Sequence, residues 1–109
     1  MGANKEAYSP VQVGGSDYET VAASQTAQVL GTAGSVGDFI SRLIISVNTV
    51  ATATVTLLDN AISIPILTGS ATLVPGVIVV EIGARSVSGA WKITTGAGAT
   101  VLAVGKFSV

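Results

Sequence analysis

The sequence contains no cysteine and no histidine, and only 10% of its 109 residues are charged. Without cysteine the chain forms no disulfide and offers no thiolate to a metal. Without histidine it lacks the commonest general base and the commonest metal ligand. Average chains are about 25% charged, so this one has few charges with which to solvate a monomer. We therefore expect a homo-oligomer or a subunit buried in a larger assembly.

Charge and patterning also exclude two classes of partner. The net charge is −1 at pH 7, whereas domains that bind nucleic acid carry a basic patch. Residues 60–80 are uncharged and long enough to cross a bilayer, but they contain two prolines and two glycines, and their apolar residues alternate. A membrane-spanning helix has no need of that alternation. The opening residues MGANKEAYSP hold no apolar stretch, so we expect no signal peptide. We predict neither nucleic acid nor membrane as a partner.

The clearest pattern in the chain is the run TVTLLDNAISIPIL at residues 54–67. Apolar and polar residues alternate on both sides of Asp59-Asn60, with one face formed by Ala53, Val55 and Leu57 and then by Ile62, Ile64 and Ile66. A period of two predicts strands with one buried face, and Asp and Asn favour a tight turn, so the run predicts a β-hairpin. Pro65 has no N–H for a ladder, which predicts an edge strand or a bulge. A metal ligand is the alternative role for Asp59, with no second carboxylate nearby in the sequence.

Further alternating runs are separated by glycine-rich turns, and no segment predicts a helix. Strands are expected at residues 27–30, 39–48, 77–82, 90–95 and 100–109, with extended chain before the first. This spacing predicts an all-β fold, an antiparallel β-sandwich or jelly-roll-like barrel of six to eight short strands, over residues 18–109. We expect Trp91 and Phe39 to fill its core.

Residues 1–17 are predicted to form an extended N-terminal arm, because glycine, serine and proline interrupt them and no period holds. Two interpretations of the arm remain open: a disordered terminus, or a segment that docks on a neighbouring subunit and orders there. Within strand 39–48 one face mixes apolar and polar side chains, which indicates partial cover by a second chain. The candidate contacts are Tyr8, Pro10, Val11 and Val13 in the arm and Ile40, Arg42 and Ile44 in the strand.

No constellation of residues indicates catalysis. Asp17 and Glu19 share a face of extended chain and could bind a cation weakly, but a solvent-exposed position at the boundary of the arm explains them as well. The glycine-rich stretch 96–100 is not followed by the helix that a phosphate loop requires. A catalytic dyad of a serine with Lys92 or Lys106 could be drawn, but any protein contains serine and lysine, so this pairing does not indicate catalysis. Two roles are open for the basic residues on or beside the predicted strands: they keep the strands soluble, or they pair with carboxylates of a partner. These residues are Arg42, Arg85, Lys92 and Lys106. We predict no enzyme, no cofactor and no metal.

Three runs of the sequence resemble small virion proteins of tailed bacteriophages, the capsid decoration, cement and head-fibre proteins. They are LGTAGSVGDFISRLIISVNT, TVTLLDNAISIPIL and VEIGARSVSGAWKITTGAGATVLAVGKF, which together cover about residues 29–107. The resemblance implies a β-sandwich or jelly roll without enzymatic activity. It implies binding to the major capsid protein or neighbouring virion subunits, and localisation in the phage head after synthesis in the host cytoplasm.

The resemblance and the composition lead to one functional hypothesis and two alternatives. The first is a decoration or cement protein that binds and stabilises the capsid. The second is a receptor- or carbohydrate-binding module such as a fibre tip, although sugar sites need exposed aromatic platforms and the chain has one tryptophan, two tyrosines and two phenylalanines. The third is a tail or baseplate subunit with the same fold.

Overall fold

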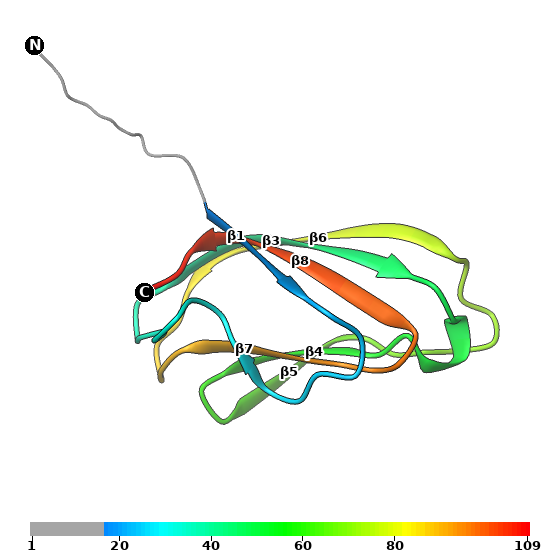
Figure 1. Ribbon diagram of the computed structural model, residues 1–109, viewed down its shortest axis with the longest axis horizontal. Helices are drawn as coiled ribbons and strands as arrows, with labels where there is room; N and C mark the ends of the chain where they lie inside the picture. The colour runs from blue at the N-terminus through cyan, green and yellow to red at the C-terminus, as the bar shows by residue number, and fades with distance from the viewer. Residues whose placement is uncertain (1–16) are drawn as a thin grey trace, which may run out of the picture.

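The structure is a computed structural model, described here for residues 17–109. Two antiparallel sheets of four strands pack face to face as a β-sandwich, which confirms the predicted fold class (Figure 1). The first sheet has the order β1-β8-β3-β6 and the second the order β2-β7-β4-β5. The strands are β1 (Asp17–Val21), β2 (Gln28–Val29), β3 (Phe39–Val47), β4 (Val55–Asp59), β5 (Ile62–Leu67), β6 (Gly76–Arg85), β7 (Trp91–Thr95) and β8 (Ala99–Lys106), with one 3-10 turn at Val50–Thr52.

The core lies between the sheets and is built by every second residue of the central strands. In β8 and β7 the buried residues alternate with half-buried ones that face outward. The same alternation runs through β4 and most of β3. Burial of these side chains is the main favourable term for a sandwich of this size. The buried apolar residues are Val21, Leu30, Ile40, Leu43, Ile45, Val47, Ala53, Val55, Leu57, Trp91, Ile93, Ala99, Val101, Ala103 and Phe107.

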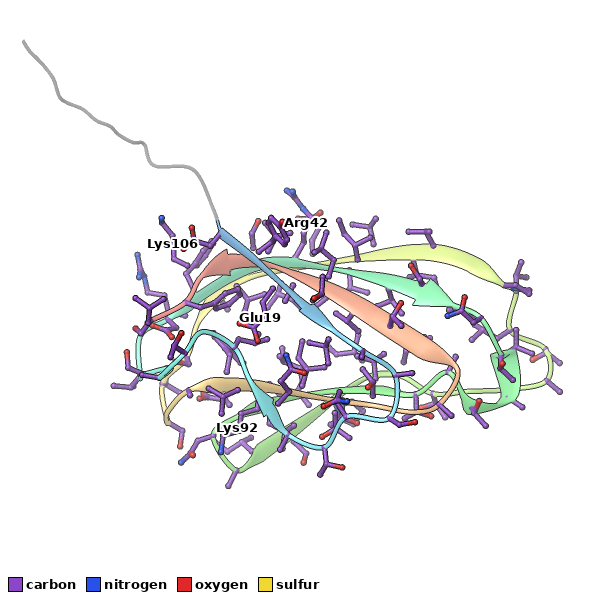
Figure 2. The ribbon with its side chains drawn as sticks, viewed as in Figure 1. Glu19, Arg42, Lys92 and Lys106 are labelled. Carbon is purple, nitrogen blue, oxygen red and sulfur yellow. The ribbon has the colours of Figure 1, made fainter. Side chains whose placement is uncertain are left out.

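Glu19 closes one side of the sandwich. It lies between the two layers, whereas Arg42 and Lys92 point away from opposite outer faces (Figure 2). Its carboxylate accepts hydrogen bonds from Gln28 Nε2 at 2.9 Å and from the Gly31 N–H at 2.7 Å. These bonds join edge strand β1 to the segment around β2, so Glu19 is a structural link and not a solvated boundary residue.

The hairpin forms where the sequence predicts it. Strands β4 and β5 pair through a turn at Asn60 and Ala61, and Asn60 adopts the left-handed conformation with φ 58°. Pro65 lies in β5, which is the edge of the second sheet and has a register shift next to Val55 and Thr56. Both options predicted for Pro65, an edge strand and a bulge, are present.

The prediction for the start of β3 is wrong. Ile40 was expected on the outer face and Phe39 in the core, but Ile40 is completely buried and Phe39 is only half-buried. A β-bulge between Ile40 and Arg42, present in the ladders with both β6 and β8, inserts an extra residue and inverts the alternation before it. The bulge brings the Phe39 carbonyl so close to Gly105 that a Cβ at this glycine would clash with it. Ile40 is therefore a core residue and no candidate for contact with a partner.

Both ends of the described chain differ from the prediction. Residues 17–21, expected as arm and extended chain, form strand β1 against β8. The strand at 27–30 is shortened to Gln28–Val29, and the last strand ends at Lys106 instead of Val109. Ser108 leaves the ladder because its N–H binds the Asp38 carboxylate and its carbonyl accepts from Ala33 and Gly34. Tyr8, Pro10, Val11 and Val13 lie outside the described residues.

Candidate interaction surface

The outer face of the first sheet carries an ordered array of apolar side chains turned away from the core. The ladder registers align its residues in rows across all four strands. One row is Thr20, Leu102, Ile44 and Val79, and the next is Tyr18, Val104, Arg42 and Glu81. We call this surface the outer face and define it by those eight residues with Ser46, Val77 and Thr100.

Several of these side chains are exposed, and the described residues 17–109 do not cover them. Tyr18 is 71% exposed, Val77 66% and Val79 54%. Between them a shallow groove of about 370 Å³ is lined by Thr20, Ile44 and Leu102, among others. Exposed apolar side chains gathered on one face of a small domain are typical of interaction sites.

The charged groups of the outer face neutralise one another. Arg42 Nε lies 3.1 Å from Glu81 Oε2. At the end of the same sheet, Lys106 Nζ lies 3.8 Å from Asp17 Oδ2. Exposed pairs of this type contribute only about 0–1 kcal/mol to stability. The Arg42–Glu81 pair leaves the eleven residues of the outer face without net charge, and Arg85 adds a positive charge at the end of the sheet, in the row of Lys106.

The opposite side of the sandwich is different in character. The outward positions of β4 and β7 include Thr56, Thr94 and Lys92, and β5 adds Ser63. Leu58 is the apolar exception on the two central strands. The two faces of the domain therefore differ, and the apolar one is formed by β1, β8, β3 and β6.

Two of the residues predicted from the sequence lie on this surface. Arg42 and Ile44 point outward from β3 as expected, whereas Ile40 does not. The sequence reasoning missed Tyr18, Leu102, Val104 and Val79. The period of two in the strand predicted at residues 100–109 could have identified two of them, since it places Leu102 and Val104 on one face and Val101 and Ala103 on the other. Nothing in the sequence shows that β8 lies between β1 and β3.

Two buried carboxylates are the remaining polar features with chemistry. Asp59, at the end of β4, accepts hydrogen bonds from the N–H groups of Val87, Ser88 and Gly89 at 3.0–3.2 Å. It therefore anchors the loop between β6 and β7, in addition to ending its own strand. Each oxygen of this carboxylate has a backbone donor, so its role is structural.

Asp38 joins the glycine-rich turn after β2 to the end of the chain. Its carboxylate accepts from Ser108 N–H at 2.9 Å, Ser108 Oγ at 2.6 Å and Ser35 N–H at 3.1 Å. Its carbonyl accepts from Trp91 Nε1 at 2.8 Å and from Ser86 N–H at 2.9 Å. Burial raises the pKa of Asp38, but the hydrogen bonds from Ser108 and Ser35 outweigh burial and leave the pKa below its usual value.

The lowered pKa makes Asp38 a source of stability that acid removes. The folded state holds the proton less tightly than the unfolded state, so the contribution is complete above the unfolded pKa near 3.8 and is lost as the pH falls through the folded value. We expect Asp38→Asn to lower the melting temperature at pH 7 and to flatten its decline below about pH 4. Melting curves of both proteins from neutral to acid pH test this. If the melting temperatures of the two proteins fall in parallel at acid pH, Asp38 is not the source of the acid-sensitive stability.

Within residues 17–109 no group of three or more acidic, cysteine or histidine side chains is placed to hold a metal ion. In the same part of the chain, no helix has the length and hydrophobicity to cross a membrane. Comparisons with family models, with curated proteins and with solved structures found no match. The outer face is therefore interpreted from its own geometry.

Proposed function

We propose that this chain is a non-enzymatic structural protein of a tailed-bacteriophage virion, a decoration or cement protein that binds the capsid through the outer face. The sequence runs given above support the choice of particle, because they resemble small head proteins of such phages. The outer face carries the proposal, since a domain with few charges leaves an apolar, charge-neutralised sheet uncovered.

The physical basis of stabilisation is mass action. A protein that binds the assembled shell but not its free subunits shifts the assembly equilibrium toward the shell. The stabilisation free energy grows with the free concentration of the protein and with its affinity for the shell. A rigid β-sheet face serves such binding well, because little conformational entropy is lost when it docks. Many small contacts across Tyr18, Ile44 and Leu102 would release water from apolar surface without burying an unpaired charge.

The alternative of a carbohydrate-binding module has weaker support. Trp91 is 3% exposed and Phe107 is 8% exposed, so neither offers a platform for a sugar ring. Among the described residues Tyr18 is the aromatic side chain that is largely exposed. A tail or fibre subunit would use the same outer face to bind a different neighbour. This alternative differs from capsid decoration only in the part of the virion to which the protein binds.

Co-sedimentation with capsid shells tests the proposal. Shells prepared without the protein are mixed with it and centrifuged, with phage tails as the competing target. We expect saturable binding to shells, at a fixed number of copies per capsid, and a rise in the temperature at which the shells open. Binding to tails alone would replace capsid decoration by the tail alternative, and binding to neither would contradict both.

The proposal also gives a role to the residues before Asp17. We expect deletion of residues 1–15 to leave the melting temperature nearly unchanged, because the described strands begin at Asp17. If the arm docks on the shell or on a neighbouring subunit, the same deletion weakens binding to shells. Thermal melting and co-sedimentation measure the two effects separately. Equal binding by the truncated and full chains would identify residues 1–15 as a dispensable terminus.

A further inference from the structure

Strand β6 is the longest strand of the described chain, and it lies at the open edge of the first sheet. None of its ten residues is buried. Its outward residues Val77 and Val79 are exposed, while Ile78, Val80 and Ile82 face the core and are only half-buried. β6 pairs with β3 on one side, and no strand within residues 17–109 pairs with the peptide groups on its other side.

The other three edges of the sandwich are protected against pairing. β1 is short, and its Glu19 points inward between the sheets. β2 has two residues. β5 contains Pro65 and a register shift. Short strands, inward charges, prolines and bulges are the features by which proteins block edge-to-edge contact. The run 77–81, VIVVE, has none of them, because the bulge in the ladder with β3 comes after it, between Glu81 and Ala84, and the one charge of the run is Glu81.

The sandwich is also open along this edge. No ladder joins β6 to β5, the edge strand of the opposite sheet. Ile62 and Ile64 of β5 are directed toward the core side but remain 53% and 37% exposed. A partner that covers this side must supply an extended backbone for β6 and apolar side chains for the seam between the sheets.

We infer that a second copy of the chain covers this edge, with β6 pairing antiparallel to its equivalent and joining the two four-stranded first sheets into one continuous sheet. A two-fold axis near Val79 or Val80 makes the strand its own partner. Valine then lies opposite each Glu81, so the two carboxylates do not face each other, and each keeps its 3.1 Å contact with Arg42. The partner's inward row of Ile78, Val80 and Ile82 continues the apolar seam.

This dimer deepens the assembly role proposed above, because it doubles the area of the outer face presented to a shell. The two inferences are separable by experiment. Self-association is measured in solution without any capsid, so its failure leaves capsid binding untouched. A protein that dimerises but does not bind shells would retain the edge pairing and lose the proposed function.

The absence of cysteine allows a direct test by cross-linking. We expect Val79→Cys, which alters an exposed side chain, to form a reductant-sensitive dimer of twice 10.8 kDa under mild oxidation. Val36→Cys is the matched control, since Val36 is 61% exposed and belongs to the loop that meets β6 at its far end, beside Arg85 and Ser86 and away from the proposed axis. Equal cross-linking of both variants, or none with Val79→Cys at tens of micromolar, would overturn the proposal. So would a preference of Val79→Cys for chains carrying Val11→Cys, which assigns the edge to the amino-terminal segment.

Charge complementation gives a second, independent readout. Val79→Lys and Val79→Glu each place like charges on both sides of the axis, so we expect each variant alone to sediment as a monomer while the unmodified chain sediments as a dimer. A mixture of the two variants should recover the dimer. Dimers formed equally well by either variant alone would show that the edge of β6 is not the contact.

Discussion

Replacing Trp91 with alanine is expected to lower the free energy of unfolding by about 3–5 kcal/mol, the range for removing a large buried aromatic side chain. The indole is 3% exposed, and its Nε1 donates to the Asp38 carbonyl at 2.8 Å. Alanine leaves a cavity, and it removes the hydrogen bond that the Asp38 carbonyl accepts from the indole. For a domain of this size the loss corresponds to a fall of roughly 12 °C or more in the melting temperature.

Trp91→Phe separates the two contributions. Phenylalanine keeps most of the buried ring but has no N–H, so we expect it to cost about 1–3 kcal/mol, less than alanine. Thermal and denaturant melting of the three proteins measure the order. An alanine variant that melts with the parent protein but has lost a binding activity would contradict the core assignment and favour an exposed platform at Trp91.

The second large effect is expected on binding. Leu102 lies in the middle of the row formed with Thr20 and Ile44, on central strand β8. A carboxylate at this position would be desolvated against the shell without a partner. We expect Leu102→Glu to weaken binding to capsid shells at least about tenfold, equivalent to about 1.4 kcal/mol. The melting temperature should change little, because the side chain is only half-buried in the free domain.

The matched control is Thr56→Glu, which adds the same charge at the centre of the opposite, polar sheet. It should bind shells as the unmodified protein does. Equilibrium co-sedimentation of the three proteins at one ionic strength provides the comparison. If Thr56→Glu loses binding and Leu102→Glu keeps it, the docking face has been assigned to the wrong sheet.

The sequence predicts the fold well where neighbouring residues determine structure. The alternation around Val55, Leu57 and Ile64, with Asn60 at the turn, is enough to define the hairpin, since strand period and turn chemistry are local properties. The burial of Trp91 follows from the same alternation within its strand. These predictions need no knowledge of which strands are neighbours.

The errors arise where distant residues meet. The bulge that buries Ile40 depends on Gly105, which lies beside the Phe39 carbonyl only after β3 and β8 pair. The roles of Asp38 and Asp59 depend on N–H groups far along the chain, at Ser108 and Ser88. The sequence predicts only Arg42 and Ile44 of the outer face. The side chains beside them depend on the strand order, which the sequence does not show.

A residue-resolution reconstruction of the phage particle by electron cryomicroscopy tests the central claim most directly. We expect copies of this sandwich on the shell with the β1-β8-β3-β6 sheet toward the capsid surface, so that Leu102, Ile44 and Tyr18 are covered. The second sheet, with Thr56 and Lys92, should face solvent. Sandwiches seated on the shell by the second sheet, or found only in the tail, would contradict it.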